Sequence, residues 1–127
     1  RSWKAPSTIL GQRIAIYATK TEQELDLCTR EPFSAHIPNR DLLPLGAIVC
    51  TVVLDRCAEM TERSVAELQR DNPEEFAFGL YEPGRFAWVL KEPERVEPAV
   101  PWRPKGQGIG FIDDEALGRI PEQGALV

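Results

Sequence analysis

The chain has 127 residues, of which 43% are hydrophobic and 28% are charged, a composition that is typical of globular proteins and excludes wholesale disorder. This length predicts one domain, because two halves would each be near the size at which a hydrophobic core becomes marginal. The net charge of −5 argues against a protein that coats nucleic acid nonspecifically, since such binding needs many Lys and Arg on phosphates. The sequence begins with Arg1 and not Met, so we expect an N-terminal segment upstream of it.

The first half of the chain predicts two strands and one helix. Residues 13–18 (RIAIYA) alternate like a strand, and residues 20–30 have the early acids and late base of a helix. The Pro-rich residues 32–44 predict an irregular connection. Residues 47–56 (AIVCTVVLDR) follow, and because five of these ten are β-branched, they predict a strand buried on both faces.

The second half begins with a helix pattern over 61–71, which Thr61 or Ser64 could cap. The aromatic residues 76–81 predict a strand, a Pro-Gly turn follows, and residues 85–91 (RFAWVLK) predict another strand. Since a tight turn separates these two segments, we expect them to form a hairpin.

The C-terminal quarter is rich in Pro and Gly. Residues 92–104 contain four Pro and predict an edge strand or an extended loop, because Pro cannot donate to a sheet. Residues 105–112 (KGQGIGFI) predict a glycine-rich strand, and residues 113–119 predict a terminal helical turn. The whole pattern predicts an α+β protein: a small, half-open β-barrel of five or six mixed or antiparallel strands with two or three flanking helices.

The sequence lacks the residue patterns that several classes of functional site require. Three Cys with no CxxC, together with the single His36, argue against a zinc site or a disulfide framework and favour a cytoplasmic location. No GxSxG, GxGxxG or P-loop pattern is present. The longest apolar run, 47–54, is too short for a membrane span. We therefore expect no metal, no cofactor and no membrane.

Basic and aromatic residues occur together in three places. Residues 1–20 hold four bases and no acid, a local excess that predicts a basic face. The three groups are Arg1, Ser2, Trp3 and Lys4; Arg85 with Phe86 and Trp88; and Trp102, Arg103 and Lys105. Cations that bind phosphates and rings that stack on bases are typical of sites for single-stranded nucleic acid or a nucleoside. Spacing alone also favours a core position for Trp88 and a solvated position for Arg85 and Lys105.

Four segments resemble the ASCH domain family, which belongs to the PUA-like superfamily of small β-barrels. They are RSWKAPSTILGQRIAIYATK (1–20), LPLGAIVCTVVLDRC (43–57), FGLYEPGRFAWVLK (78–91) and PWRPKGQGIGFI (101–112). The resemblance runs in order over nearly the whole chain, and it identifies residues 1–127 as one such domain that lacks its extreme N-terminal segment.

The resemblance implies an RNA- or nucleoside-binding protein. Arg1 matches the last residue of the family motif Gly-x-Lys-x-x-Glu-x-Arg, and the motif's Lys and Glu would lie upstream. The implied nucleic-acid-binding residues are Arg1, Ser2, Trp3, Lys20, Arg85 and Lys105. Because some small members hydrolyse N4-acetylcytidine or RNA, the alternative function is that of an amidohydrolase or a ribonuclease. No catalytic residue is assigned, and the downstream Glu of the amidohydrolases is left open among Glu59, Glu62, Glu67 and Glu82.

Overall fold

The computed structural model describes residues 1–20, 25–104, 118 and 120, and these residues form an α+β fold. The strands are β1 (Arg13–Ala18), β2 (Ala47–Glu59) and β3 (Phe86–Pro101), and the α-helices are α1 (Glu62–Asp71) and α2 (Pro73–Phe78). Short 3₁₀ turns occupy Ser7–Ile9, Leu25–Thr29, Phe33–Ala35 and Arg40–Leu42. None of the helices in these residues is long and apolar enough to cross a membrane.

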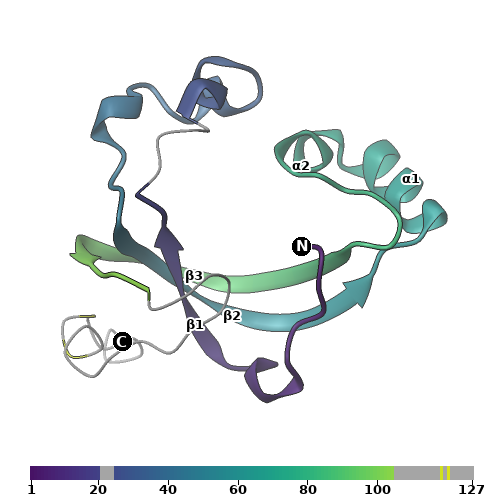
Figure 1. Ribbon diagram of the computed structural model, residues 1–127. Coiled ribbons are helices and arrows are strands. Elements are labelled where there is room, and N and C mark those ends of the chain that lie inside the picture. Colours follow the sequence, from purple (N-terminus) through teal and green to yellow (C-terminus); the bar gives the residue numbers. More distant parts are fainter. Residues whose placement is uncertain (21–24, 105–117, 119, 121–127) are drawn as a thin grey trace.

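The three strands form one antiparallel sheet in the order β1-β2-β3. Figure 1 shows β2 and β3 as a long curved ribbon, with β1 beside β2 and the helices beyond its far end. Register shifts between Ile48 and Cys50, between Thr51 and Val53 and again after Leu54 mark irregularities of the kind that bend a strand. The sheet is not closed over the described residues, so the predicted barrel of five or six strands is reduced there to a three-stranded sheet.

The best-buried part of the molecule lies at the start of β2. Ile48 of β2 packs with Val96 and Val100 of β3, and all three are at most 5% exposed. The strand prediction for 47–56 is confirmed, but the expectation of burial on both faces holds only as far as Leu54. Beyond it Asp55, Arg56, Ala58 and Glu59 are exposed, because this end of β2 extends past the core toward the helices.

Gly46 fixes the entry into β2. Its φ is +64°, a conformation that costs an L-residue with a side chain roughly 1–2 kcal/mol. A Cβ placed there would lie 3.0 Å from Cγ of Lys20. The Gly46 amide donates to the Ala18 carbonyl at 2.7 Å and its carbonyl accepts from the Trp102 amide at 3.1 Å, so one residue joins the beginning of β2 to the ends of β1 and β3.

Helix α1 confirms the prediction for 61–71, and it begins with a capping box. The Thr61 hydroxyl accepts from the Ser64 amide at 3.1 Å, and the Ser64 hydroxyl accepts from the Thr61 amide at 2.8 Å. The two side chains thereby satisfy backbone donors that the first turn of a helix leaves unpaired.

The strand predicted over 76–81 is wrong, because residues 73–78 form α2. The Asn72 side chain accepts from the Glu75 amide at 3.2 Å, and Pro73 occupies the first turn, where its missing N–H costs nothing. Glu74 and Glu75 add negative charge near the helix N-terminus. The Asn-Pro-Glu-Glu start signal outweighs the β-propensity of the aromatic residues that follow.

The predicted hairpin is therefore wrong as well, although its turn is present. Gly84 has a φ of +87°, and the Arg85 amide donates to the Glu82 carbonyl at 3.2 Å. With no strand before this turn, β3 pairs with β2, and Phe86 lies opposite Glu59. The strand predicted within 92–104 is present as far as Pro101, and among the described residues β3 is an outer strand of the sheet.

Two further predictions are met only in part or lie outside the described residues. In place of a helix over 20–30, the described part of that segment holds the 3₁₀ turn Leu25–Thr29, in which the Thr29 hydroxyl donates to the Asp26 carbonyl at 2.8 Å. The strand predicted over 105–112 lies outside the described residues, and so does the turn predicted over 113–119 apart from Gly118.

Candidate functional site

The N-terminal residues lie along the beginning of β3. The Arg1 backbone nitrogen donates to the Phe86 carbonyl at 2.8 Å, and the Phe86 amide donates to the Arg1 carbonyl at 2.7 Å. Residues that exchange both bonds lie directly opposite each other, as in an antiparallel pair. Further along, the Ala5 amide donates to Cys57 Sγ at 3.4 Å, and Ala5 is only 3% exposed. The first residues of the chain are thus held against both β3 and β2.

Two tryptophans hold the Arg1 side chain. Its guanidinium carbon lies 4.7 Å from the centre of the Trp88 ring and 5.1 Å from that of Trp3. The two rings meet edge to face with their centres 5.4 Å apart, and Trp88 Nε1 donates to the Trp3 carbonyl at 3.2 Å. Stacking on a ring leaves the N–H donors of a guanidinium, which lie in its own plane, free for other acceptors.

Arg85 brings a second cation to the same place. Its Nε atom is fully buried, and no residue that the structure describes accepts a hydrogen bond from it. Arg85 directly precedes Phe86, the residue whose backbone pairs with that of Arg1, so the two arginines start from neighbouring positions. Two positive charges and two tryptophan rings therefore share one location.

A tyrosine and a carboxylate line the same cavity. The Tyr81 hydroxyl donates a hydrogen bond to the Glu75 carboxylate of α2. Burial, followed by the hydrogen bond and the negative charge of Glu75, raises the pKa of Tyr81 to about 12. The phenol therefore keeps its proton at neutral pH, and Glu75 remains an acceptor beside it.

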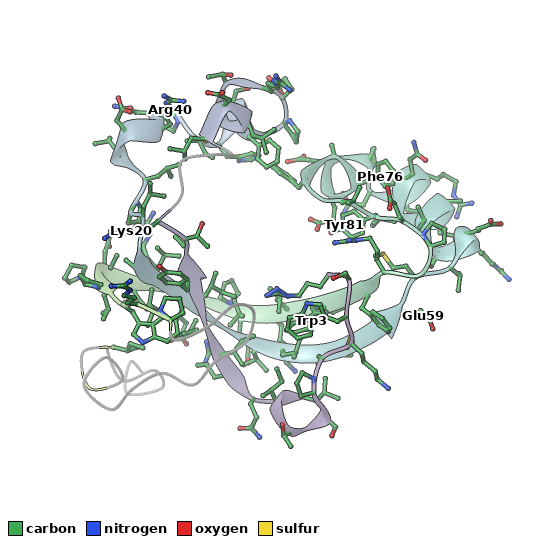
Figure 2. The ribbon with its side chains drawn as sticks, in the orientation of Figure 1. Trp3, Lys20, Arg40, Glu59, Phe76 and Tyr81 are labelled. Atoms are coloured by element: carbon green, nitrogen blue, oxygen red, sulfur yellow. The ribbon has the colours of Figure 1, made fainter. Side chains whose placement is uncertain are left out.

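One large cavity of about 2310 Å³ is bounded by β1, β2, β3, α1, α2 and the N-terminal residues, and it extends to Ile48 and Trp102 at the other end of the sheet. The side chains of this site that line it are Arg1, Trp3, Glu75, Tyr81, Arg85 and Trp88. Its volume exceeds the roughly 300–1,000 Å³ of a fitted small-molecule pocket, so a small ligand would occupy only part of this groove. In Figure 2, Trp3 and Tyr81 lie toward the end of the β2–β3 ribbon that leads to the helices, and Lys20 lies toward the opposite end.

The structure brings together three of the six predicted binding residues. Arg1, Trp3 and Arg85 all line the cavity, whereas Ser2 is exposed and is not among the lining residues. Lys20 lies beside Gly46 at the beginning of β2, while Arg1 pairs with Phe86, opposite the last residue of that thirteen-residue strand. Since each strand residue advances about 3.3 Å, Lys20 and Arg1 are near opposite ends of the sheet. Lys105 lies outside the described residues.

Two residues that line the cavity, Trp88 and Tyr81, are not among the binding residues predicted from the sequence. Trp88 belongs to one of the three basic and aromatic groups, but spacing favours a core position for it; it is half-buried, lines the cavity and packs on Arg1. Tyr81 lies in the segment 76–81, for which the sequence predicts a strand that does not form. Both stand within a few residues of Arg85 in the sequence, and that proximity around the Pro-Gly turn was the available signal.

The remaining candidates for catalysis or metal binding are the glutamates and the cysteines. Of the four glutamates left open as a catalytic group, only Glu59 is among the described residues that line the cavity. No cluster of three or more potential metal ligands occurs in the ranges that the structure covers. All three cysteines are free, and burial raises the pKa of the Cys50 thiol.

Comparisons of this chain with protein-family models, with curated proteins and with solved structures gave no match.

Proposed function

We propose that this protein is an RNA- or nucleoside-binding member of the ASCH family, with Arg1, Trp3 and Arg85 in its binding groove. The observation that carries the proposal is the grouping of two cations and two tryptophan rings in one cavity. No described carboxylate forms an ion pair with either cation, so their charge is available to a ligand. The proposal also includes the family's barrel of five or six strands and a cytoplasmic location.

The grouping fits a short strand or one nucleoside better than a nonspecific coat. Guanidinium groups bind phosphate oxygens in a bidentate way, and each stacked base adds about 1–3 kcal/mol. Trp3 is still 39% exposed while it supports Arg1, so part of its ring remains accessible to a base. The net charge of −5 over the whole chain then limits binding to this local basic site.

The test is the salt dependence of binding to a fluorescently labelled single-stranded RNA of roughly eight nucleotides, within the usual site sizes of 4–16. We expect Arg85→Ala to weaken binding and to reduce the slope of log K against log salt by about 0.7, the value for one phosphate contact on a single strand. Fluorescence anisotropy at several salt concentrations measures both quantities.

Arg63→Ala is the matched control. It removes the same charge from the outer surface of α1, where Arg63 has a side chain 89% exposed and pairs with Glu67 at 3.0 Å. If the Arg85 and Arg63 variants bind RNA with the same affinity and slope as the unaltered protein, Arg85 has no part in the site.

The alternative function is hydrolysis of N4-acetylcytidine or RNA. Glu59 is the one glutamate of the earlier four that lines the described part of the cavity, so it is the residue to replace first. Incubation of folded protein with N4-acetylcytidine and with labelled RNA, followed by chromatography, would reveal cytidine or shortened strands. Binding without product supports the binding function alone.

A further inference from the structure

Among the described residues, an unusual electrostatic feature is the pair of cations, Arg1 and Arg85, at the beginning of β3. Most other arginines in the described ranges have acidic partners: Arg13 with Glu94 at 3.7 Å, Arg40 with Asp26 at 3.0 Å, and Arg70 with Asp71 at 2.9 Å. Arg1 and Arg85 have no such partner there, and they lie near each other because Arg85 directly precedes Phe86, whose backbone pairs with that of Arg1. Burial of the Arg85 Nε without an acceptor among the described residues costs desolvation energy.

The surrounding residues hold Arg1 and Arg85 in place, but none of the described ones supplies a negative charge to either cation. The Arg1 guanidinium carbon lies within about 5 Å of the Trp3 and Trp88 ring centres, at 5.1 and 4.7 Å, and the exchanged backbone bonds with Phe86 hold its main chain. Arg85 is fixed at the turn, where its carbonyl accepts from the Met60 amide at 2.8 Å. Two positive groups held in position, with donors that no described residue accepts, form a receptor for an oxyanion.

We propose, resting on the function proposed above, that Arg1 and Arg85 together bind the terminal phosphate of a nucleotide. The ligand is then a nucleoside monophosphate or the phosphorylated end of a strand, and not an uncharged nucleoside.

The charges select a terminal phosphate over an internal one. A phosphate monoester carries about −1.5 to −2 charges at pH 7, which matches two guanidinium groups, whereas a phosphodiester inside a strand carries one. The same cavity offers surface for the remainder of a nucleotide, because Trp3 and the Glu75–Tyr81 pair also line it. An aliphatic carboxylate would use only part of the charge and none of the aromatic surface.

The experiment compares each common ribonucleoside with its own 5′- and 3′-monophosphates by isothermal titration calorimetry at pH 7. We expect at least one monophosphate to bind about tenfold or more tightly than its nucleoside, the usual range for charged hydrogen bonds. Arg85→Met and Arg1→Met should each remove this advantage, while binding of the nucleoside changes less than about twofold. Arg63→Met, on the exposed surface of α1, should keep it.

A second measurement separates a binding role of Arg85 from a structural one. Because its buried Nε lacks a partner among the described residues, Arg85→Met should leave the Tm of the ligand-free protein unchanged or raise it. The monophosphate should raise the Tm of the unaltered protein and not that of the variant, since a ligand stabilises only the state that it binds. A fall in the Tm of the ligand-free variant would show a structural Arg85 and overturn the assignment.

The outcomes distinguish this inference from the proposed function. If nucleosides and monophosphates bind equally well, the phosphate receptor is refuted while nucleoside binding stands. If the monophosphate advantage persists in Arg85→Met, the receptor lies elsewhere and the inference fails. If neither nucleosides, monophosphates nor single-stranded RNA bind, the proposed function fails first. Strands with and without a 5′-phosphate then decide whether the bound monoester belongs to a strand end or to a free nucleotide.

Discussion

At the scale of single residues, Tyr81 shows how one hydrogen bond links the site to pH. In the folded protein its pKa is about 12, above the ordinary value of 10.0, because burial and the bond to Glu75 favour the neutral phenol. A raised folded pKa means that the corresponding stabilisation is complete below pH 10 and is lost as the pH rises toward 12.

We therefore expect Tyr81→Phe to lower the free energy of unfolding by about 1 kcal/mol or less at pH 8, the usual value of one partly exposed hydrogen bond. The difference between the two proteins should shrink between pH 10 and 12, the interval over which Tyr81 ionises. Urea denaturation at a series of pH values measures this. Glu75→Gln, which keeps the phenol and removes the charged acceptor, should show the same convergence. A difference that stays constant up to pH 12 would contradict the assigned coupling.

At the scale of elements, the described helices are short and depend on their first turns. Helix α1 spans ten residues and has no buried residue, so its capping box supplies a large share of its local stability. Thr61 and Ser64 act reciprocally, each accepting a backbone N–H of the other.

Thr61→Ala should destabilise the protein by about 1 kcal/mol, because it leaves the Ser64 amide without its acceptor. Thr61→Ser, which retains a hydroxyl, should restore most of this loss. Chemical denaturation gives the free energies, and the double variant Thr61→Ala with Ser64→Ala should lose less than the sum of the two single losses. Full additivity would mean that the two caps act independently.

At the scale of the whole molecule, a small contact joins two segments that are far apart in the sequence. The Phe33 and Phe78 rings meet edge to face with their centres 5.2 Å apart, and His36 Nε2 lies 3.1 Å from Glu74 Oε1. We call these four residues the closing contact. Figure 1 shows that the turns before β2 and helix α2 approach each other on the side of the molecule away from the sheet ribbon.

Phe78→Ala should weaken the closing contact without affecting the sheet. An aromatic pair contributes about 0.5–1.5 kcal/mol beyond its buried area, so amides of the Phe33 turn should exchange hydrogen up to roughly tenfold faster. The His36 and Ile37 amides, which donate to the Phe33 carbonyl, report this change in hydrogen-exchange mass spectrometry. Leu42→Ala removes a side chain of the same segment that is 78% exposed, and it should have no such effect. Equal exchange in both variants would show that the contact does not hold the two segments together.

Much of the local structure follows from the sequence, because it depends on neighbours in the chain. The alternation in 13–18, the β-branched run in 47–56 and the capped periodicity of 61–71 predict β1, β2 and α1. The strand predicted over 76–81 fails because aromatic content was weighed above the cap formed by Asn72, which only a reading of the helix start reveals. Arg1, Trp3 and Arg85 are predicted binding residues through the family resemblance, whereas spacing alone favours a solvated position for Arg85.

The sequence by itself determined the α+β fold class, the positions of the central strand β2 and the capped helix α1, and which basic and aromatic side chains are candidates for ligand binding. Only the tertiary structure decided that β3 pairs with β2, that Arg1 lies between Trp3 and Trp88, and that Lys20 is at the other end of the sheet. The physical reason is that strand partners and cation contacts join residues that are far apart in the sequence, such as Arg1 and Phe86, which are 85 positions apart and share a backbone hydrogen bond. Local propensity cannot choose among such partners. These partners are determined by the register of the strands, by burial and by the curvature of the sheet.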